Sequence, residues 1–188
     1  MKLLIIAFTF FPMCMTSQVL TGYNSGFVVT NKNDTIYGLL KLRNTFPYRV
    51  HESVLFRQTE EAQPQPFPPA EIKGFVIGKE IYESKYLSDK KERKGFFQIK
   101  IKGFLSYYEM ESYGGPQAGS SYKVLLQKED TDQLFIYDVG NFFFPFRRKL
   151  SEYLKDYPEL ASKIKHNVYN EVHIIQIVNK YNNFIKTK

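Results

Sequence analysis

The chain has 188 residues, of which 43% are hydrophobic and 16% are aromatic, with 17 Phe, 14 Tyr and no Trp. This length suits one domain, and the apolar content is sufficient to bury a core, which excludes wholesale disorder and a collagen-like chain. The formal net charge of +7 predicts a basic surface that attracts phosphates, anionic glycans or acidic lipid headgroups, although net charge does not determine the fold.

Residues 1–17 are predicted to be a signal peptide that directs export. A positive start, Met1-Lys2, precedes an apolar run at residues 3–11, and small polar residues place the predicted cleavage close to Ser17. No second run of 18 apolar residues follows. We therefore expect a secreted protein with no transmembrane span after signal removal.

The single cysteine, Cys14, lies inside this leader. The mature chain is then expected to have no disulfide, no thiol nucleophile and no cysteine zinc cluster. An alternative is that Cys14 is a lipid-attachment site that tethers the mature protein to a membrane. Such sites usually carry Leu three residues before the cysteine, where this chain has Phe11.

Short apolar segments separated by Gly, Asn, Asp and Pro predict about nine strands at hairpin spacing. The Pro-rich segment 63–69 is expected to be a surface crossing, because proline cannot donate ladder hydrogen bonds. In the strand at 95–102, alternation predicts Phe97, Ile99 and Ile101 on one buried face. The predicted strands are 26–30, 35–42, 54–57, 72–77, 81–87, 95–102, 104–111, 122–127 and 133–139.

From residue 142 the apolar spacing becomes helical. Asp156 is predicted to cap a second helix and Asn170 a third. A strand stays open for the third segment, because it is rich in β-branched residues. The predicted core stripes are Phe146, Leu150, Tyr153, Leu154 and Tyr157, then Leu160 and Ile164, then Val172, Ile175, Val178, Tyr181 and Asn182.

The predicted fold class is α+β: an antiparallel β-sandwich or partly open barrel of about nine strands, followed by two or three C-terminal helices. The β-rich region is expected to span residues 18–141. The helical region, 142–188, is expected to pack on the sheet, so that the two regions form one domain overall.

Several packing and turn motifs carry a resemblance. They are Gly26 to Thr30 with Asp34 to Gly38, then Glu71 to Phe75, and an ending that includes Leu150 to Asp156, Leu160, Ile164 and Tyr181-Asn182. In these residues the chain resembles a group of uncharacterised exported proteins of Bacteroidota. The resemblance implies a Gram-negative cell envelope, either periplasmic or associated with the outer membrane or cell surface. It implies no reaction, because that group has no assigned activity.

A candidate ligand surface lies on the strand at 104–111. Glu109 and Glu111 share a strand face at a spacing of about 7 Å, which fits an inverting pair of glycosidase carboxylates. Tyr107 and Tyr108 next to them are candidates for a sugar platform. Coincidence is the competing explanation, because tyrosine is an ordinary strand former.

Two basic clusters are candidate anion contacts. The first consists of Lys90, Lys91, Arg93 and Lys94, with Lys100 and Lys102 on the following strand. The second contains Arg147, Arg148 and Lys149 near a helix start, where cations oppose the helix dipole unless an anion compensates. A solvated surface is the alternative for both. Nucleic acid is not an expected partner of an exported protein.

Thr35 is a candidate glycosylation site, because Asp34-Thr35-Ile36 resembles the pattern glycosylated at Thr in some Bacteroidota. The alternative is that these polar residues form a hairpin corner. No metal site or cofactor is predicted, because the three histidines are scattered and zinc needs three or four converging ligands.

These observations favour a non-enzymatic binding or structural domain of the envelope, whose partner is an envelope protein or a glycan. The alternative is a hydrolase that acts on envelope or extracellular polysaccharide through strand carboxylates. A small outer-membrane barrel is disfavoured by the predicted terminal helices and by the charged, irregular strands.

Overall fold

The computed structural model describes residues 22–42, 52–88, 90–113, 120–131, 133–141 and 143–187. The predicted signal peptide and Cys14 lie outside the described residues. Within the described ranges, no helix has the length and apolar character needed to cross a membrane.

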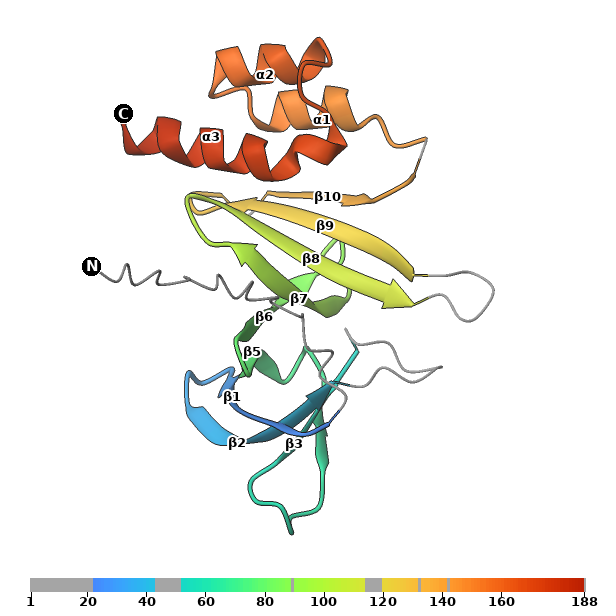
Figure 1. Ribbon diagram of the computed structural model, residues 1–188, viewed down its shortest axis with the longest axis vertical. Helices are drawn as coiled ribbons and strands as arrows, with labels where there is room; N and C mark the ends of the chain where they lie inside the picture. The colour runs from blue at the N-terminus through green and yellow to red at the C-terminus, as the bar shows by residue number, and fades with distance from the viewer. Residues whose placement is uncertain are drawn as a thin grey trace, which may run out of the picture.

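The described strands form one continuous antiparallel sheet of ten, in the order β10-β9-β8-β7-β6-β5-β1-β2-β3-β4, which is not closed into a barrel (Figure 1). Helices follow the sheet in the chain, so the predicted α+β class is confirmed. The strands are β1 (Asn24–Thr30), β2 (Thr35–Leu42), β3 (Val54–Arg57), β4 (Gln65–Phe67), β5 (Ile72–Ile77), β6 (Glu80–Tyr86), β7 (Lys94–Ile101), β8 (Leu105–Tyr113), β9 (Ser120–Lys128) and β10 (Leu134–Asp138).

The Pro-rich segment differs from the prediction, because three of its residues form β4. This strand pairs with β3, and Pro66 lies opposite Leu55. Alternate residues of an antiparallel strand direct their N–H groups away from the neighbour, so an edge strand can hold a proline at such a position. The segment therefore contributes an edge strand, and not only a surface crossing.

A β-bulge in β7 corrects the predicted alternation. The register with β8 shifts between Ile99 and Ile101, which turns the residues after the bulge onto the other face of the sheet. Phe97 belongs to one buried cluster and Ile99 packs against it, whereas Ile101 packs against the cluster that contains the helices. The prediction that all three share a face was wrong for Ile101.

Three helices and a short 3₁₀ turn cover one face of the β8–β10 end of the sheet, which we call the helix side (Figure 1). α3 contacts β8, α1 contacts β10, and α2 packs on both helices. Their bounds are α1 (Phe146–Tyr153), α2 (Pro158–Lys165), η1 (Glu171–His173) and α3 (Ile174–Lys186).

Two details of the helices differ from the prediction. Tyr157 occupies the N-cap position of α2 without a side-chain cap hydrogen bond, and Asp156 instead directs its carboxylate to other elements. Asn170 does cap the third helical segment, through the N–H of Val172. However, Val172 and Ile175 are 85% and 55% exposed, so they are not core residues.

The buried side chains form three clusters. The helical core joins the helices to β8, β9 and β10, and includes Leu105, Leu126, Leu150 and Tyr181. The N-terminal core lies among β1, β2, β3, β5, β6 and β7, and includes Val28, Leu40, Phe75 and Phe96. The back-face cluster consists of Phe97, Tyr108, Met110, Leu125 and Leu134.

Close backbone contacts in the N-terminal half require glycine. Gly26 lies opposite Gly38 on one side and Ile77 on the other. A Cβ atom on Gly26 would lie 1.9 Å from the carbonyl oxygen of Val76, far inside van der Waals contact. Any side chain here would push β1 and β5 apart.

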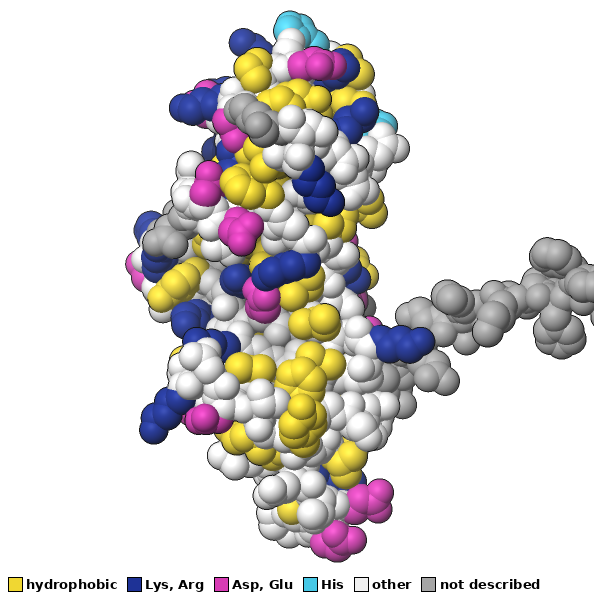
Figure 2. All heavy atoms as spheres, turned by 90° about the vertical axis from the view of Figure 1, so that its left-hand side faces the viewer, with side chains coloured by type: hydrophobic (Ala, Val, Ile, Leu, Met, Phe, Trp, Pro, Cys, Tyr) yellow, Lys and Arg dark blue, Asp and Glu magenta, His cyan; other side chains and the backbone are white. Residues whose placement is uncertain are grey.

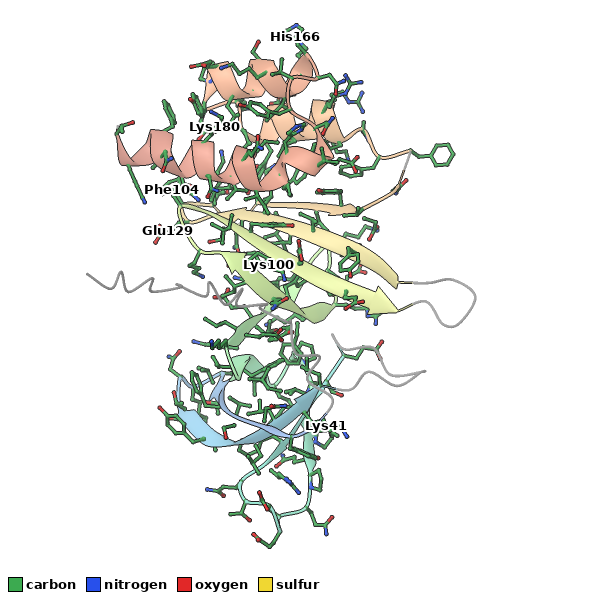
Figure 3. The ribbon with its side chains drawn as sticks, viewed as in Figure 1. Lys41, Lys100, Phe104, Glu129, His166 and Lys180 are labelled. Carbon is green, nitrogen blue, oxygen red and sulfur yellow. The ribbon has the colours of Figure 1, made fainter. Side chains whose placement is uncertain are left out.

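Asn182 fastens α3 to the start of β8. Its Oδ1 accepts the N–H of Leu105 at 2.7 Å, and its Nδ2 donates to the Leu105 carbonyl at 2.9 Å. A Cβ on Gly103 would lie 2.6 Å from Asn182 Nδ2, so glycine leaves room for the amide. Phe104 and Glu129, at the same end of the sheet below α3 (Figure 3), are joined by a 2.8 Å backbone hydrogen bond.

Candidate functional site

The structure divides the predicted ligand surface between the two faces of β8. Tyr107, Glu109 and Glu111 alternate onto the helix side, whereas Tyr108 lies in the back-face cluster. Tyr107 and Tyr108 are only 3% and 1% exposed. The two tyrosines are therefore not brought together into one exposed platform.

Glu109 is engaged by two neighbours. The Tyr107 hydroxyl donates a hydrogen bond to its Oε1, and Lys100 Nζ lies 3.4 Å from its Oε2. Burial, together with the bond to Glu109, raises the pKa of Tyr107 above its ordinary range. Figure 3 places Lys100 on the sheet, away from the helical end that His166 marks. Glu111 is exposed.

On the other face, Tyr108 joins a charged cluster around Glu83. Glu83 accepts the Tyr108 hydroxyl at 3.0 Å and forms ion pairs of 2.8 Å with both Lys85 and Lys102. Burial alone would raise the pKa of Glu83, but hydrogen bonds from the two lysines hold it below its usual value. Both lysines thus share a single carboxylate within the chain, which offsets one of their two positive charges.

The two predicted basic clusters lie on different elements. Lys90, Lys91 and Arg93 are exposed in the β6–β7 turn, and Lys94 begins β7. Arg147 and Arg148 are exposed in the first turn of α1. Over the face that Figure 2 shows, basic and acidic side chains are mixed, so the positive charge is not gathered there into one patch.

Thr35 is exposed at the first position of β2. The preceding corner is organised by Thr30, whose hydroxyl accepts the N–H groups of Lys32 and Asp34 at 3.2 and 3.1 Å. Asn33 has a φ of 71°, a conformation that Asn adopts more readily than most residues. The turn thus has its own structural reasons for these polar residues.

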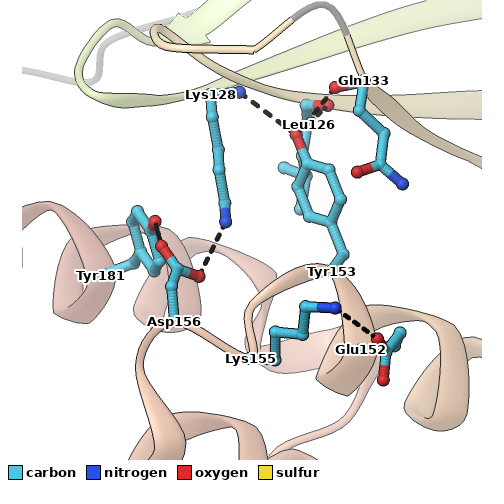
Figure 4. Close-up of polar contacts among 8 residues, drawn as sticks. All are labelled: Leu126, Lys128, Gln133, Glu152, Tyr153, Lys155, Asp156 and Tyr181. Atoms are coloured by element: carbon cyan, nitrogen blue, oxygen red, sulfur yellow. Dashed lines mark hydrogen bonds and ion pairs between the residues drawn. The ribbon is translucent and has the colours of Figure 1, made fainter.

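A polar cluster joins the end of β9 to the helices (Figure 4). Lys128 Nζ lies 2.7 Å from Asp156 Oδ1, and the Tyr181 hydroxyl donates to Asp156 Oδ2. The side chain of Lys128 is 11% exposed and lies 5.2 Å from the ring centroids of both Tyr153 and Tyr181. Lys128 of β9 therefore contacts three residues of the helical region, Tyr153, Asp156 and Tyr181.

The cluster also sets the proton affinities of its members. Burial alone would raise the pKa of Asp156, but hydrogen bonds from Lys128 and Tyr181 hold it below the ordinary aspartate value. Burial, with the bond to Asp156, raises the pKa of Tyr181. These shifts keep Asp156 ionised beside a protonated Tyr181. Both the ion pair to Lys128 and the hydrogen bond from Tyr181 are thereby maintained.

The hydroxyl of Tyr153 completes the ladder between β9 and β10. It accepts the N–H of Lys128 at 3.1 Å and lies 3.1 Å from the carbonyl oxygen of Gln133, to which it donates. One side chain of α1 therefore bridges the last rung of the sheet. This fixes α1 beside β10.

β10 is an edge strand whose only neighbour in the described sheet is β9. Val139 N–H donates to the Tyr122 carbonyl at 2.8 Å, and antiparallel ladders alternate inward and outward backbone groups. With the observed register, the N–H and C=O of Phe135 and Tyr137 face β9. Those of Leu134 and Ile136 face outward.

An open groove of about 1730 Å³ runs beside this strand. It is lined by Leu134, Phe135 and Ile136 of β10. Because Phe135 belongs to the helix side and Leu134 to the back-face cluster, a groove that touches both follows the edge of the strand. Its other wall includes Arg147, Arg148 and Lys149 of α1, which we call the α1 cations.

The sequence predicted the strand at 133–139 and a basic cluster at the α1 cations, but not that they share a groove. The sequence feature that could have indicated an unprotected edge is the uncharged run of four residues, Leu134 to Tyr137. Among the described residues, no group of three or more His, Cys, Asp or Glu side chains is placed to hold a metal ion.

Comparisons of the chain with protein-family models, with curated proteins and with solved structures found no match.

Proposed function

We propose that this chain is an exported, non-enzymatic protein of the cell envelope that binds a protein partner through β10, by accepting an extended segment of that partner as an additional strand. The signal-like start and the resemblance to exported Bacteroidota proteins support the location. The observation that carries the binding proposal is the open apolar edge of β10 beside a groove.

The two edges of the sheet are built differently. At one end, β4 has three residues, contains Pro66 and is flanked by Pro64, Pro68 and Pro69. Prolines and short length are standard protections of an edge, because they remove donors for a further strand. At the other end, Leu134 to Tyr137 carry no charge and no proline. Such an unprotected edge pairs readily with another chain.

The groove gives an incoming segment access to that edge. Strand addition supplies affinity through main-chain hydrogen bonds and specificity through side-chain contacts on alternate faces. The outward N–H and C=O groups of Leu134 and Ile136 offer main-chain hydrogen bonds, and the walls of the groove offer side-chain contacts. The edge therefore has both parts of a strand-addition site.

The experiment compares capture by the tagged mature protein with capture by Ile136→Pro and Ile136→Val. Both substitutions change the same side chain, but only proline removes the outward N–H, and no ladder bond to β9 depends on that group. Proteins retained from the native envelope are identified by mass spectrometry, and the fold of each variant is checked by circular dichroism.

We expect a reproducible partner on the wild type and on Ile136→Val, and its loss on Ile136→Pro. Equal retention by the proline variant would show that β10 is not the binding edge. If the wild type retains nothing even after cross-linking, the binding proposal itself fails.

A further inference from the structure

We infer that the segment added at β10 is acidic, with carboxylate side chains alternating with apolar ones. This inference rests on the proposed strand addition and names the chemistry of its partner. It follows from which charges of the groove are compensated within the chain.

The groove is lined by six Lys or Arg side chains and four Asp or Glu side chains. Two of the carboxylates are already engaged: Asp156 pairs with Lys128 at 2.7 Å, and Glu152 with Lys155 at 2.9 Å. Among the described residues, no carboxylate pairs with an α1 cation. Lys149 instead lies 4.7 Å from the ring centroid of Phe144.

The position of the α1 cations increases their effect. They occupy the first turn of a helix that has no acidic residue there and no side-chain cap. The positive end of the helix dipole therefore adds to the three side-chain charges, where an acidic residue would normally offset it. An anionic group on the partner supplies the missing compensation.

The geometry of a strand fixes where these anions belong. Successive side chains of an added strand point to opposite faces of the sheet. One set lies on the helix side, toward the α1 cations. The other set continues the row of Leu134 and Ile136 on the opposite face, where the back-face cluster is apolar. The fitting segment therefore alternates acidic and apolar residues.

A second copy of this chain fits the same edge less well. Antiparallel pairing of β10 with β10 requires a two-fold axis perpendicular to the joined sheet, which places both α1 helices side by side on one face. The two sets of α1 cations then repel each other across the junction. Charge therefore favours an acidic partner over self-association.

The test is selection of displayed ten-residue peptides on the full mature protein. In the library, five alternate positions hold Val, Ile, Leu or Thr, and the other five sample Glu, Asp, Lys, Arg and Ser. We expect enrichment of Glu and Asp, and at least tenfold weaker binding of the enriched peptides to Arg147→Ser/Arg148→Ser. The matched control, Lys90→Ser/Arg93→Ser, removes the same charge from the other basic cluster and is expected to bind as the wild type does.

The outcomes separate the two proposals. Enrichment without an acidic bias, equal weakening by the control pair, or no enrichment at all would overturn the acidic segment. If peptides bind without charge preference and Ile136→Pro abolishes their binding, strand addition stands and only the charge selection fails. If acidic peptides bind Ile136→Pro as well as the wild type, strand addition itself is wrong. A dimer of the wild type in sedimentation experiments that Ile136→Pro dissolves would identify a second copy as the occupant.

Discussion

Asn182 of α3 forms hydrogen bonds with the backbone of β8, as a neighbouring strand would. One amide group satisfies both the N–H and the C=O of Leu105, which are buried where the helix covers the strand. Lys128 and Tyr153 also connect the sheet to the helices. Lys128 of β9 pairs with Asp156, and Tyr153 of α1 bonds the backbone beside β9 and β10. Single polar side chains thus set how the helices lie on the sheet.

Replacing Asn182 by Leu keeps a similar volume but leaves both groups of Leu105 without partners. A buried donor or acceptor left unpaired costs about 1–3 kcal/mol, so we expect Asn182→Leu to lower the free energy of unfolding by about 2–4 kcal/mol. Urea unfolding followed by circular dichroism measures it.

Asn183, the next residue, provides the matched control, because it is exposed. Asn183→Leu is expected to change the free energy of unfolding by less than about 0.5 kcal/mol. If both variants lose the same stability, helix propensity explains the effect and the contact with Leu105 does not.

Acid should weaken the contact that Asp156 makes. Its folded-state pKa lies below the ordinary value of an aspartate, so the unfolded state binds the proton first as the pH falls. The stabilising contribution is then complete above about pH 4 and is lost as the pH drops through the folded pKa. We expect the stability difference between wild type and Asp156→Asn to shrink below about pH 4.

Urea unfolding at several pH values between neutral and about pH 2.5 tests this, because that range spans the titration of an ordinary aspartate. Lys128→Met supplies the comparison: without the cation that lowers the pKa of Asp156, the same Asp156→Asn difference should depend less on pH. A difference that stays constant with pH in the wild-type background would contradict the assigned ionic contact.

At the scale of elements, the alternating segments of the chain predicted nearly every strand, because period-two burial is a local property. The bulge at Lys100 was not predictable, since the sequence around it alternates without interruption while the register with β8 shifts. β4 was missed because its prolines argue against a strand except at an edge. Whether a strand lies at an edge depends on the order of all the strands.

The helices show a similar limit. Asn170 was a correct cap, but a 3₁₀ turn follows it before α3 begins. A 3₁₀ turn has about three residues per turn, so a stripe counted at the α-helical period from Asn170 is rotated away from the core. This explains why Val172, which lies in that turn, is exposed. Ile175 already lies in α3 and is exposed although Val178 and Tyr181 are buried.

The polar cluster and the groove could not be predicted from sequence patterns, for a different reason. Lys128 and Asp156 are 28 residues apart in the chain, and nothing in either local segment indicates the other. The same holds for β10 and the α1 cations, which meet only because α1 returns over the edge strand. Local patterns predict elements, whereas sites of this kind arise from their assembly.

At the scale of the whole molecule, one sheet carries three separate clusters of buried side chains. Consecutive residues of β7 show the connection: Phe96 belongs to the N-terminal core and Phe97 to the back-face cluster, on opposite faces of the strand. Losing β7 therefore exposes apolar surface in both halves. This shared strand should make the two halves unfold together.

Val28→Ala tests this cooperativity, because Val28 is fully buried in the N-terminal core and the helices lie at the other end of the sheet (Figure 1). Deleting two buried methyl groups should cost about 1–3 kcal/mol. We expect the urea midpoint of the helical signal at 222 nm, the far-ultraviolet band of α-helices, to fall with that of the whole protein. A helical midpoint that does not move would mean that the helical end unfolds independently.

The unequal edges of the sheet also limit stoichiometry. A sheet that ends in prolines at β4 and in free backbone groups at β10 can grow in one direction only. On the proposed strand addition, each molecule accepts a single strand, and a filament built by repeated edge pairing cannot propagate, because every further copy would have to join at β4. The protein can offer an unprotected strand without seeding a fibre.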